Sequence, residues 1–306
     1  MVKYEILIFT YNQENLISNA IRSAVNQTHT PSMIRVFDDC STDSTYQIAQ
    51  KEASKYNVPI EVHRNETNLG VFKNFNQMIA LSTGDITSVL AGDDELELDF
   101  IENIDNFIRH NDLDLTKPIW MLPSVTEVYD NNKEIKCYYG DNDNDKAFEL
   151  ILAGKVRSFE VGLTLSALRM SYIKEGIGYQ ADNLKSWLVS KKAQFIFLPF
   201  FAYRYRVGVG VTDKSKVHDI YVSRKKCLEL FNEDGSIFIT ERESVLIKYE
   251  EAKVDRYLSP NVKNYLKLLN MVLQVMCLKN NPYGLKRLIL PLFPTSLVKL
   301  YSIFVN

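Results

Sequence analysis

The first hundred residues alternate short apolar runs with helical patterns, and this alternation restricts the fold more than any other feature. Apolar runs occupy residues 4–10, 34–38, 60–64 and 86–91. Between them, apolar residues such as Leu16, Ile17, Ala20 and Ile21 recur at the spacing of one helix face. Strands and helices in regular alternation predict an α/β fold with a mostly parallel central sheet covered by helices on both faces.

A polar cluster follows three of the predicted strands. The clusters read "TYNQE", "DDCSTD" and "AGDDE". Because the carboxyl ends of parallel strands form the ligand crevice of such sheets, we expect these clusters to lie together at a binding site. Each cluster alone is typical of turns and helix caps, but three in succession indicate a site.

The sequence contains no Walker A motif and no G-x-G-x-x-G after the first strand, so a glycine-rich phosphate cradle is disfavoured. A phosphate ligand would then need another counter-charge. The adjacent carboxylates of Asp93 and Asp94 repel one another unless a cation or hydrogen-bond donors relieve them. Mn²⁺ or Mg²⁺, which prefer oxygen ligands, would both neutralise the phosphate and relieve the repulsion between the two carboxylates.

Taken in order, four segments resemble the motifs of the family-2 glycosyltransferases. They are "IFTYNQENLISNAIRSAVNQT", "FDDCSTDST", "NETNLGVFKNFNQMIALSTGD" and "LAGDD". The resemblance is close over residues 4–100, weaker over 160–206 and absent after about 215. It implies a GT-A fold, a nucleoside-diphosphate sugar donor that is most often UDP-linked, a divalent metal on its diphosphate, and inverting transfer of the sugar to an acceptor hydroxyl.

The resemblance also assigns donor-binding residues. Those of the first two motifs lie where the family packs its loops around the base and ribose: Thr10, Tyr11, Asn12, Asp38 and Asp39. An aromatic side chain beside polar groups suits a base, which offers both a π face and hydrogen-bonding edges. Asp43 of the second motif is favoured as a helix cap.

The third and fourth motifs supply the groups expected near the diphosphate. Asn68 and Gly70 match the third motif, where glycine lets the backbone approach the ligand. Lys73 either places a cation near the diphosphate or is a solvated helix residue. Asp93 and Asp94 match the metal-binding position, and Asp93 also falls at the donor. Many relatives carry a further carboxylate where this chain has Ala91, so the metal would rest on fewer protein ligands.

In the second half, the resemblance points to a base and a cation. "YQADNLKSWL" places Asp182 where the family has the carboxylate that takes the acceptor proton, with Ala181 in place of its Glu. The alternative for Asp182 is a helix N-cap. Arg206 falls in the family's Tyr-Arg-x-His pattern, in which Gly208 replaces the histidine. Arg206 either supplies positive charge at the donor or is structural.

We expect a glycosyltransferase domain over residues 1–212, with a nucleotide-sugar half (1–100) and an acceptor half (101–212), and a helical region over 213–306. Within 101–212, a polar stretch near 129–146 is expected to be a solvated loop at its acidic end. The apolar and basic residues 285–306 suit a cytoplasmic membrane surface. Equally, they would fold back into the core or dock on a second subunit, forming a homo-oligomer through the C-terminal helices. The segment is too interrupted for a transmembrane span.

Composition narrows the functional classes. A formal net charge of −2 gives no electrostatic case for a nucleic-acid partner. Four scattered cysteines suggest neither a zinc site nor disulfides, and the N-terminus resembles a strand and not a signal peptide, so we expect a cytoplasmic protein. A saccharide or lipid-linked acceptor in surface-polysaccharide assembly (capsule, O-antigen or exopolysaccharide) fits these features. The alternative is a non-catalytic relative that binds nucleotides or carbohydrates; a dinucleotide oxidoreductase lacks its glycine fingerprint.

Overall fold

The computed structural model describes residues 2–131, 133–159, 161–172, 176–178, 180–208 and 217–293. The chain forms two compact units. The first consists of Met1–Ala147, Ser158–Glu175 and Leu188–Thr212, and the second of Phe148–Arg157, Gly176–Trp187 and Asp213–Asn306. The second unit thus includes two short segments from within residues 1–212, the range expected to form the glycosyltransferase domain.

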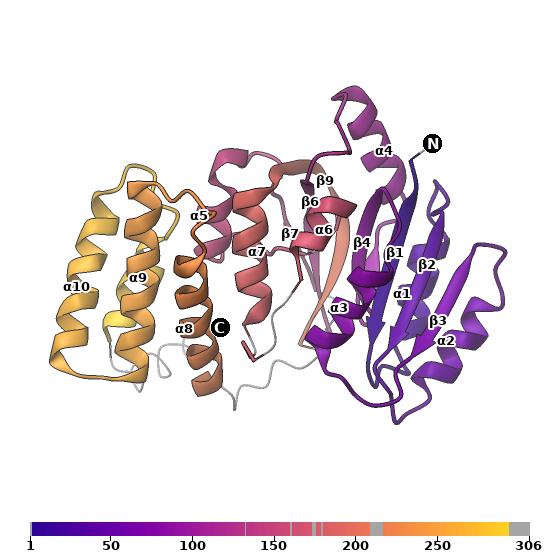
Figure 1. Ribbon diagram of the computed structural model, residues 1–306, viewed down its shortest axis with the longest axis horizontal. Coiled ribbons are helices and arrows are strands. Elements are labelled where there is room, and N and C mark those ends of the chain that lie inside the picture. Colours follow the sequence, from indigo (N-terminus) through magenta and orange to yellow (C-terminus); the bar gives the residue numbers. More distant parts are fainter. Residues whose placement is uncertain are drawn as a thin grey trace. The chain divides into compact units, whose positions relative to one another are not determined.

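The first half of the first unit is the predicted α/β alternation. Its elements are β1 (Tyr4–Thr10), α1 (Ile17–Val25), β2 (Met33–Asp38), α2 (Thr45–Ala53), β3 (Ile60–Arg64), α3 (Val71–Leu81) and β4 (Ile86–Ala91). The four strands are parallel and lie in the order β3-β2-β1-β4 (Figure 1). β1 and β4 are almost wholly buried, as expected of central strands with helices on both faces.

The strand order reverses direction at β1, and this reversal positions the site. The chain moves outward from β1 through β2 to β3 and then returns to the other side of β1 as β4. Register places Thr10 of β1 beside Asp38 of β2, and Phe9 beside Ala91 of β4. Crevices at such reversal points, outside the carboxyl ends of the strands, are where α/β sheets bind ligands.

The second half of the first unit makes the sheet mixed. It contains β5 (Glu95–Leu96), α4 (Phe100–His110), β6 (Ile119–Tyr129), β7 (Glu134–Cys137), η1 (Asn144–Lys146), β8 (Leu163–Thr164), α6 (Leu165–Met170) and β9 (Gln194–Val207). β8 is antiparallel to β4 and β6, β9 is parallel to β6, and β5 is antiparallel to β9. The sheet is mostly parallel, as expected, because its longest pairing in this half, β6 with β9, is also parallel, and the antiparallel pairings of β5, β7 and β8 are short.

A short strand lies inside the polar stretch whose acidic end was expected to be a solvated loop. β7 pairs with β6 in antiparallel register, for example Thr126 with Lys136. The side chains of β7 are mostly exposed. The strand therefore contributes main-chain hydrogen bonds at one end of β6 and little to the core. The acidic end of the stretch is a loop followed by η1, as expected.

The second unit is helical. It holds most of α5 (Ala147–Leu152) and the start of α7 (Ala181–Lys192), with α8 (Val217–Glu233), α9 (Glu241–Leu258), α10 (Val262–Cys277), α11 (Leu285–Ile289) and η3 (Leu290–Leu292). α9 packs between α8 and α10, and begins at a capping box formed by Thr240 and Glu243. Among the residues that the structure describes, no helix combines the length and apolar character needed to span a membrane.

Candidate nucleotide-sugar site

A tight turn, Gly92 to Asp94, carries the acidic pair at the end of β4. The Gly92 amide donates to the Phe9 carbonyl at 2.9 Å, which places the turn against the end of β1. A Cβ atom on Gly92 would lie 2.5 Å from Gln13 Oε1 and 2.8 Å from Thr10 Oγ1. Only glycine therefore lets the two carboxylates lie this close to the first loop.

Asp94 is buried and held by β9. Its carboxylate accepts a hydrogen bond from the Tyr203 hydroxyl and another from the Arg206 backbone amide, each at 2.8 Å. Burial, followed by the charge of Asp93, raises the pKa of Asp94 to about 7, against the opposing effect of these hydrogen bonds. Asp94 is thus fixed in orientation by two donors from one strand.

Asp93 is the more accessible of the two carboxylates. Burial raises its pKa, whereas a hydrogen bond from the Gln13 side chain and the charge of Arg206 act in the opposite direction. The Thr10 hydroxyl donates to Gln13 Oε1 at 2.8 Å. The side-chain amide nitrogen of Gln13 is therefore the group that donates to Asp93. Gln13 therefore connects the end of β1 to the acidic pair.

Arg206 lies over the same turn. Its Nε donates to the Asp93 carbonyl oxygen at 3.2 Å, and its terminal nitrogen lies 3.3 Å from Glu95 Oε1. A pocket of about 190 Å³ opens here, lined by Asp93, Glu95, Val128, Glu134, Arg204 and Arg206. Its carboxylates and guanidinium groups offer contacts to both the hydroxyls and the anionic groups of a ligand.

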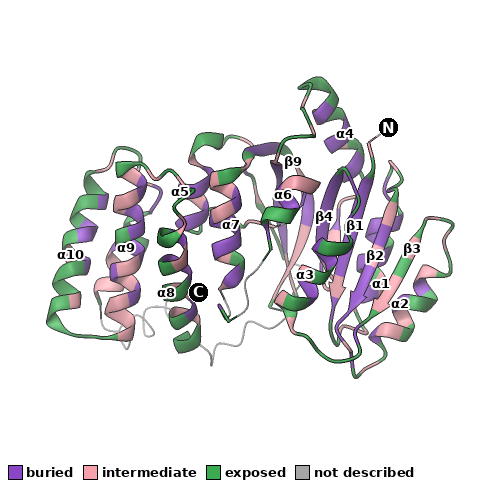
Figure 2. Cartoon of the chain, in the orientation of Figure 1, coloured by how far each residue is buried: buried purple, intermediate pink, exposed green. Residues whose placement is uncertain are grey.

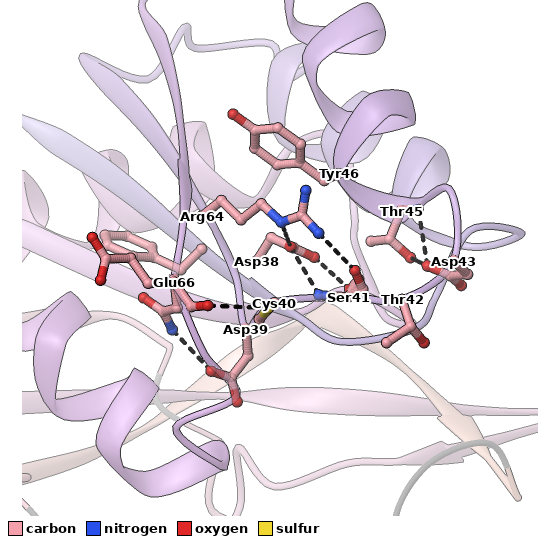
Figure 3. A network of polar contacts seen from close by, with 12 residues as sticks. Asp38, Asp39, Cys40, Ser41, Thr42, Asp43, Thr45, Tyr46, Arg64 and Glu66 are labelled. Atoms are coloured by element: carbon pink, nitrogen blue, oxygen red, sulfur yellow. Dashed lines mark hydrogen bonds and ion pairs between the residues drawn. The ribbon is translucent and has the colours of Figure 1, made fainter.

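The second loop, after β2, is built around Asp38. This fully buried carboxylate accepts hydrogen bonds from the Ser41 amide and hydroxyl, and Arg64 Nε lies 3.5 Å from Oδ2 (Figure 3). The Arg64 guanidinium also donates to the Ser41 carbonyl and lies 5.0 Å from the centre of the Tyr46 ring. Arg64 and Tyr46 thus place a partly exposed cation and an aromatic ring at one edge of the site.

Asp39 holds the third loop in place. Its carboxylate accepts from the Asn65 side chain and from the amides of Leu69 and Gly70, each at 2.8 Å. Gly70 has φ +79°, which favours glycine, and its amide also donates to Asn68 Oδ1. The predicted donor-binding residues of the second and third motifs are therefore neighbours, and Asp39 has an organising role that the sequence did not assign.

The first loop joins the second through Asn12. Its amide donates to Ser41 Oγ, and its side-chain oxygen accepts from the Thr42 amide at 2.8 Å. Tyr11 remains 43% exposed, so its ring is available to a ligand. Asp43, expected to be a helix cap, precedes the N-cap residue Ser44 of α2; it accepts from the amide and hydroxyl of Thr45 and from the Glu14 amide of the first loop.

Two further predicted residues are exposed. Lys73 is exposed on α3. Asp182 is exposed in the first turn of α7, within the second unit, a position that suits a helix cap and a base equally well. The end of the segment "YRVGVGVT", from 209 onward, lies outside the described residues, whereas Gly208 has φ +91°.

Sequence reasoning missed three residues that shape the site: Gln13, Arg64 and Tyr203. Arg64 had a usable signal, because it ends β3 in register with Asp38 at the end of β2. Gln13 belongs to the quoted first motif, although its contact with the acidic turn is not readable there. Tyr203 had no local signal, since 109 residues separate it from Asp94.

The carboxylates of the acidic turn suit a divalent cation that binds to few protein ligands. Within the described ranges, no group of three or more His, Cys, Asp or Glu side chains is arranged to hold a metal. Asp93 and Asp94 remain as two adjacent carboxylates, which matches the way Mg²⁺ binds through one or two carboxylates with phosphates and water completing its shell. The residues therefore fit a cation that binds together with a diphosphate.

A parallel α/β half followed by a mixed half, with an acidic pair at the strand-order reversal, is the GT-A fold. Residues 5–165 match the family model described as glycosyl transferase family 2. The chain belongs to this family.

Curated relatives match parts of the chain. Poly(ribitol-phosphate) beta-N-acetylglucosaminyltransferase TarS of Staphylococcus aureus is 32% identical over 122 residues, which cover 38% of this chain and 21% of TarS. Glycosyltransferase GlyA of Streptococcus pneumoniae is 25% identical over 225 residues, covering 67% of this chain and 31% of GlyA. The matched segments therefore span about a fifth to a third of these relatives.

Solved structures share the fold. S. aureus TarS in complex with UDP-GlcNAc aligns with a TM-score of 0.66 and 18% identity, covering 88% of this chain and 79% of that one. The mannosyltransferase PcManGT from Pyrobaculum calidifontis, in complex with GDP-Man and Mn²⁺, aligns with a TM-score of 0.57 and 15% identity, covering 99% and 80%. At these identities the likeness establishes the architecture.

Proposed function

We propose that the protein transfers a sugar, with inversion, from a nucleoside-diphosphate sugar to a hydroxyl of a saccharide or lipid-linked saccharide acceptor. One observation carries the proposal: the acidic turn Gly92–Asp94 lies at the strand-order reversal, against the first loop and beneath Arg206. Membership of family 2 and the nucleotide-sugar complexes of structural neighbours support the same reaction class.

The donor would lie across the ends of β1, β2 and β4. Tyr11 and Asn12 would contact the base and ribose, with Arg64 at the edge of the same loop cluster. Asn68, Gly70 and Lys73 would line the third loop on the diphosphate side. We propose a UDP-linked donor because the TarS structure holds UDP-GlcNAc. The PcManGT structure holds GDP-Man, so the first screen should include both UDP- and GDP-linked sugars.

Asp93 and Asp94 would hold Mn²⁺ or Mg²⁺, which supplies positive charge to the diphosphate as the sugar leaves. The protein's own contribution is orientation: Tyr203 and the Arg206 amide fix Asp94, and Gln13 fixes Asp93. The Arg206 guanidinium would add a second positive charge on the pocket side. Asp182 would accept the proton of the attacking hydroxyl.

The test combines donor binding with turnover. UDP- and GDP-sugars are titrated into the full chain with and without Mn²⁺, because a ligand that binds only the native state raises its melting temperature. Donor hydrolysis is then compared among wild type, Asp93→Asn, Asp94→Asn and Asp182→Asn. We expect the first two to lose metal-dependent binding and turnover, and Asp182→Asn to keep binding while turnover falls by about 100-fold or more.

Asp114→Asn is a matched control, since Asp114 is an exposed turn carboxylate remote in sequence from the motifs. Its activity should equal that of wild type. Full activity of both Asp93→Asn and Asp94→Asn would refute the metal assignment. Binding of a donor without turnover by the wild type, for every common donor, would instead favour a non-catalytic binding protein. The anomeric configuration of the product, read by NMR, tests inversion.

A further inference from the structure

Helix α10 has two apolar faces, and the part of the chain that the structure describes covers one of them. Its inner face packs into the second unit through Leu268, Met271, Val272 and Val275, which are at most 6% exposed. On the outer side, large apolar side chains face solvent at exposed fractions of 37% to 75%. We call these residues the outer stripe: Val262, Tyr265, Leu266, Leu273 and Met276. Figure 2 shows the exposed side of α10 beside its buried side.

The members of the outer stripe lie along one side of α10. They recur at intervals of three, four and seven, which places them on one side of the helix over its whole length. Single exposed apolar residues are normal on proteins, but a contiguous row of this size marks a surface that another phase or molecule covers. An amphipathic helix with one apolar face would have sufficed for packing against α9.

Beyond Asp255, the sequence that contains the outer stripe carries charges of a single sign. After Asp255 the sequence contains seven Lys and Arg residues and no Asp or Glu, although the whole chain has 38 acidic residues. Lys263 and Lys267 lie on α10 itself, and Lys279 follows its end; all three are exposed. One of them, Lys267, pairs with Asp255 at 2.9 Å. The formal charge of −2 therefore conceals an acid-free, basic end in an otherwise acidic chain.

We propose that the outer stripe of α10 docks on an anionic membrane surface. The apolar row would enter the boundary between headgroups and acyl chains, while the flanking lysines meet anionic headgroups. A second copy of the chain complements this surface less well, because the exposed lysines of the two copies would be brought together. The proposal is independent of the proposed reaction, and it moves the expected membrane contact from residues 285–306 to α10.

Residues at the beginning of the earlier expected segment support this shift. Leu288 is buried, the Tyr249 hydroxyl donates to the Arg287 carbonyl, and the Arg287 guanidinium donates to the carbonyls of Ala153 and Gly154. This part of 285–306 is therefore committed to the second unit, although Leu285 and Phe293 stay exposed. Residues 294–306 lie outside the described part of the chain.

The experiment is co-sedimentation of the full chain with vesicles of phosphatidylcholine alone or mixed with phosphatidylglycerol. Wild type should bind the anionic vesicles and bind the neutral ones weakly. The double variant Leu266→Glu/Leu273→Glu should require about tenfold more lipid, or greater, for half binding, because two leucines lose their apolar burial. Raising salt from about 0.1 M to about 1 M should weaken wild-type binding, since charge screening shortens from about 10 Å to about 3 Å.

Leu98→Glu is the matched control, because Leu98, Leu266 and Leu273 are each 56% exposed and Leu98 lies in the first unit. Its lipid binding should equal that of wild type. A second variant, Lys263→Glu/Lys279→Glu, keeps the outer stripe intact and should weaken binding to anionic vesicles by about fivefold or more per lysine. Circular dichroism melts establish that each variant is folded.

Several results would overturn the proposal. Equal lipid binding by wild type and by the folded Leu266→Glu/Leu273→Glu variant would exclude the outer stripe. Loss of binding only when the chain is ended at Phe293 would assign the membrane contact to residues 294–306. Wild-type self-association that this double variant abolishes, without vesicle binding at either composition, would identify a second copy as the partner.

Discussion

At the scale of single residues, two adjacent carboxylates have different physical situations. Asp94 is buried and receives donors from Tyr203 and Arg206, whereas Asp93 is more accessible and receives a donor from Gln13. The repulsion between them is thus relieved in part by fixed donors of the protein. A cation would complete that relief, with Asp93 presenting the more open oxygen atoms.

Gly92→Ala tests how closely the acidic turn must approach the first loop. The new Cβ would lie 2.5 Å from Gln13 Oε1, so Gln13 and Thr10 must move and the donor to Asp93 is displaced. We expect turnover to fall by about 100-fold, as when a positioning group shifts by about 1 Å, while the melting temperature changes little. Steady-state kinetics with donor and Mn²⁺ measure the loss. Wild-type kinetics in a correctly folded variant would show that the close approach is unnecessary.

At the scale of elements, the end of the sheet opposite the site is held by a buried carboxylate. Glu5 of β1 accepts from the Ser82 hydroxyl and from the amides of Thr83 and Gly84, and it pairs with Arg35 of β2. One side chain therefore joins β1, β2 and the connection between α3 and β4. This contact serves the fold and does not touch the proposed donor.

Glu5→Gln should lower the free energy of unfolding by about 2 kcal/mol, because the buried site loses its charged hydrogen-bond acceptor and Arg35 keeps only its second partner, Glu61. Urea denaturation measures this change. Turnover per folded molecule should equal that of wild type at a temperature well below the melting transition. A fall in turnover without a fall in stability would contradict the separation between this end of the sheet and the site.

The first half of the sheet was predictable from sequence, and the second half only in part. β1 and β4 occupy the predicted ranges, because buried parallel strands give unbroken apolar runs. β7 escaped notice since an outlying strand with exposed side chains has no apolar pattern. The pairing of β6 with β9 shifts register beyond Leu122, where each strand contains a proline that cannot donate to the ladder. Such shifts depend on which strands meet.

The same distinction applies to the site. Asp93, Asp94 and the loops after β1 and β2 could be located because each is local in sequence and follows a strand. The hydrogen-bond donors that orient Asp94 could not be located from the sequence, because Tyr203 lies on β9, and the pairing of β9 with β5 is a property of the folded chain. The predicted role of Asp39 was donor binding, whereas its contacts with the amides of Leu69 and Gly70 depend on distances that no local pattern encodes.

At the scale of the whole molecule, the second unit contains its own charged centre. Glu250 of α9 is fully buried and pairs with Arg224 of α8 at 2.8 Å and with Lys253 at 2.6 Å, while the Tyr283 hydroxyl donates to it. Burial would raise the pKa of Glu250, but the Lys253 and Arg224 charges and the hydrogen bonds hold it at about 2. Folding therefore stabilises the ionised form.

This lowered pKa predicts acid sensitivity. An unfolded Glu has a pKa near 4.5, so the contribution of Glu250 to stability is complete above that pH and is lost as the pH falls from about 4.5 towards 2. Glu250→Gln should be less stable than wild type by about 3 to 5 kcal/mol at neutral pH, and this difference should shrink in acid. Thermal melts of both proteins across this range measure it. Parallel curves would contradict the assignment.

Part of the candidate site is formed by β9, which lies outside the segment that identifies the family. Residues 5–165 carry the family match, yet Tyr203 and Arg206, which orient Asp94, come from a strand beyond it. A hybrid made by exchanging only residues 1–165 between relatives would place one protein's acidic pair against another protein's last strand. Exchanges intended to move donor specificity between members of this family should therefore carry β9 together with the loops of the first half.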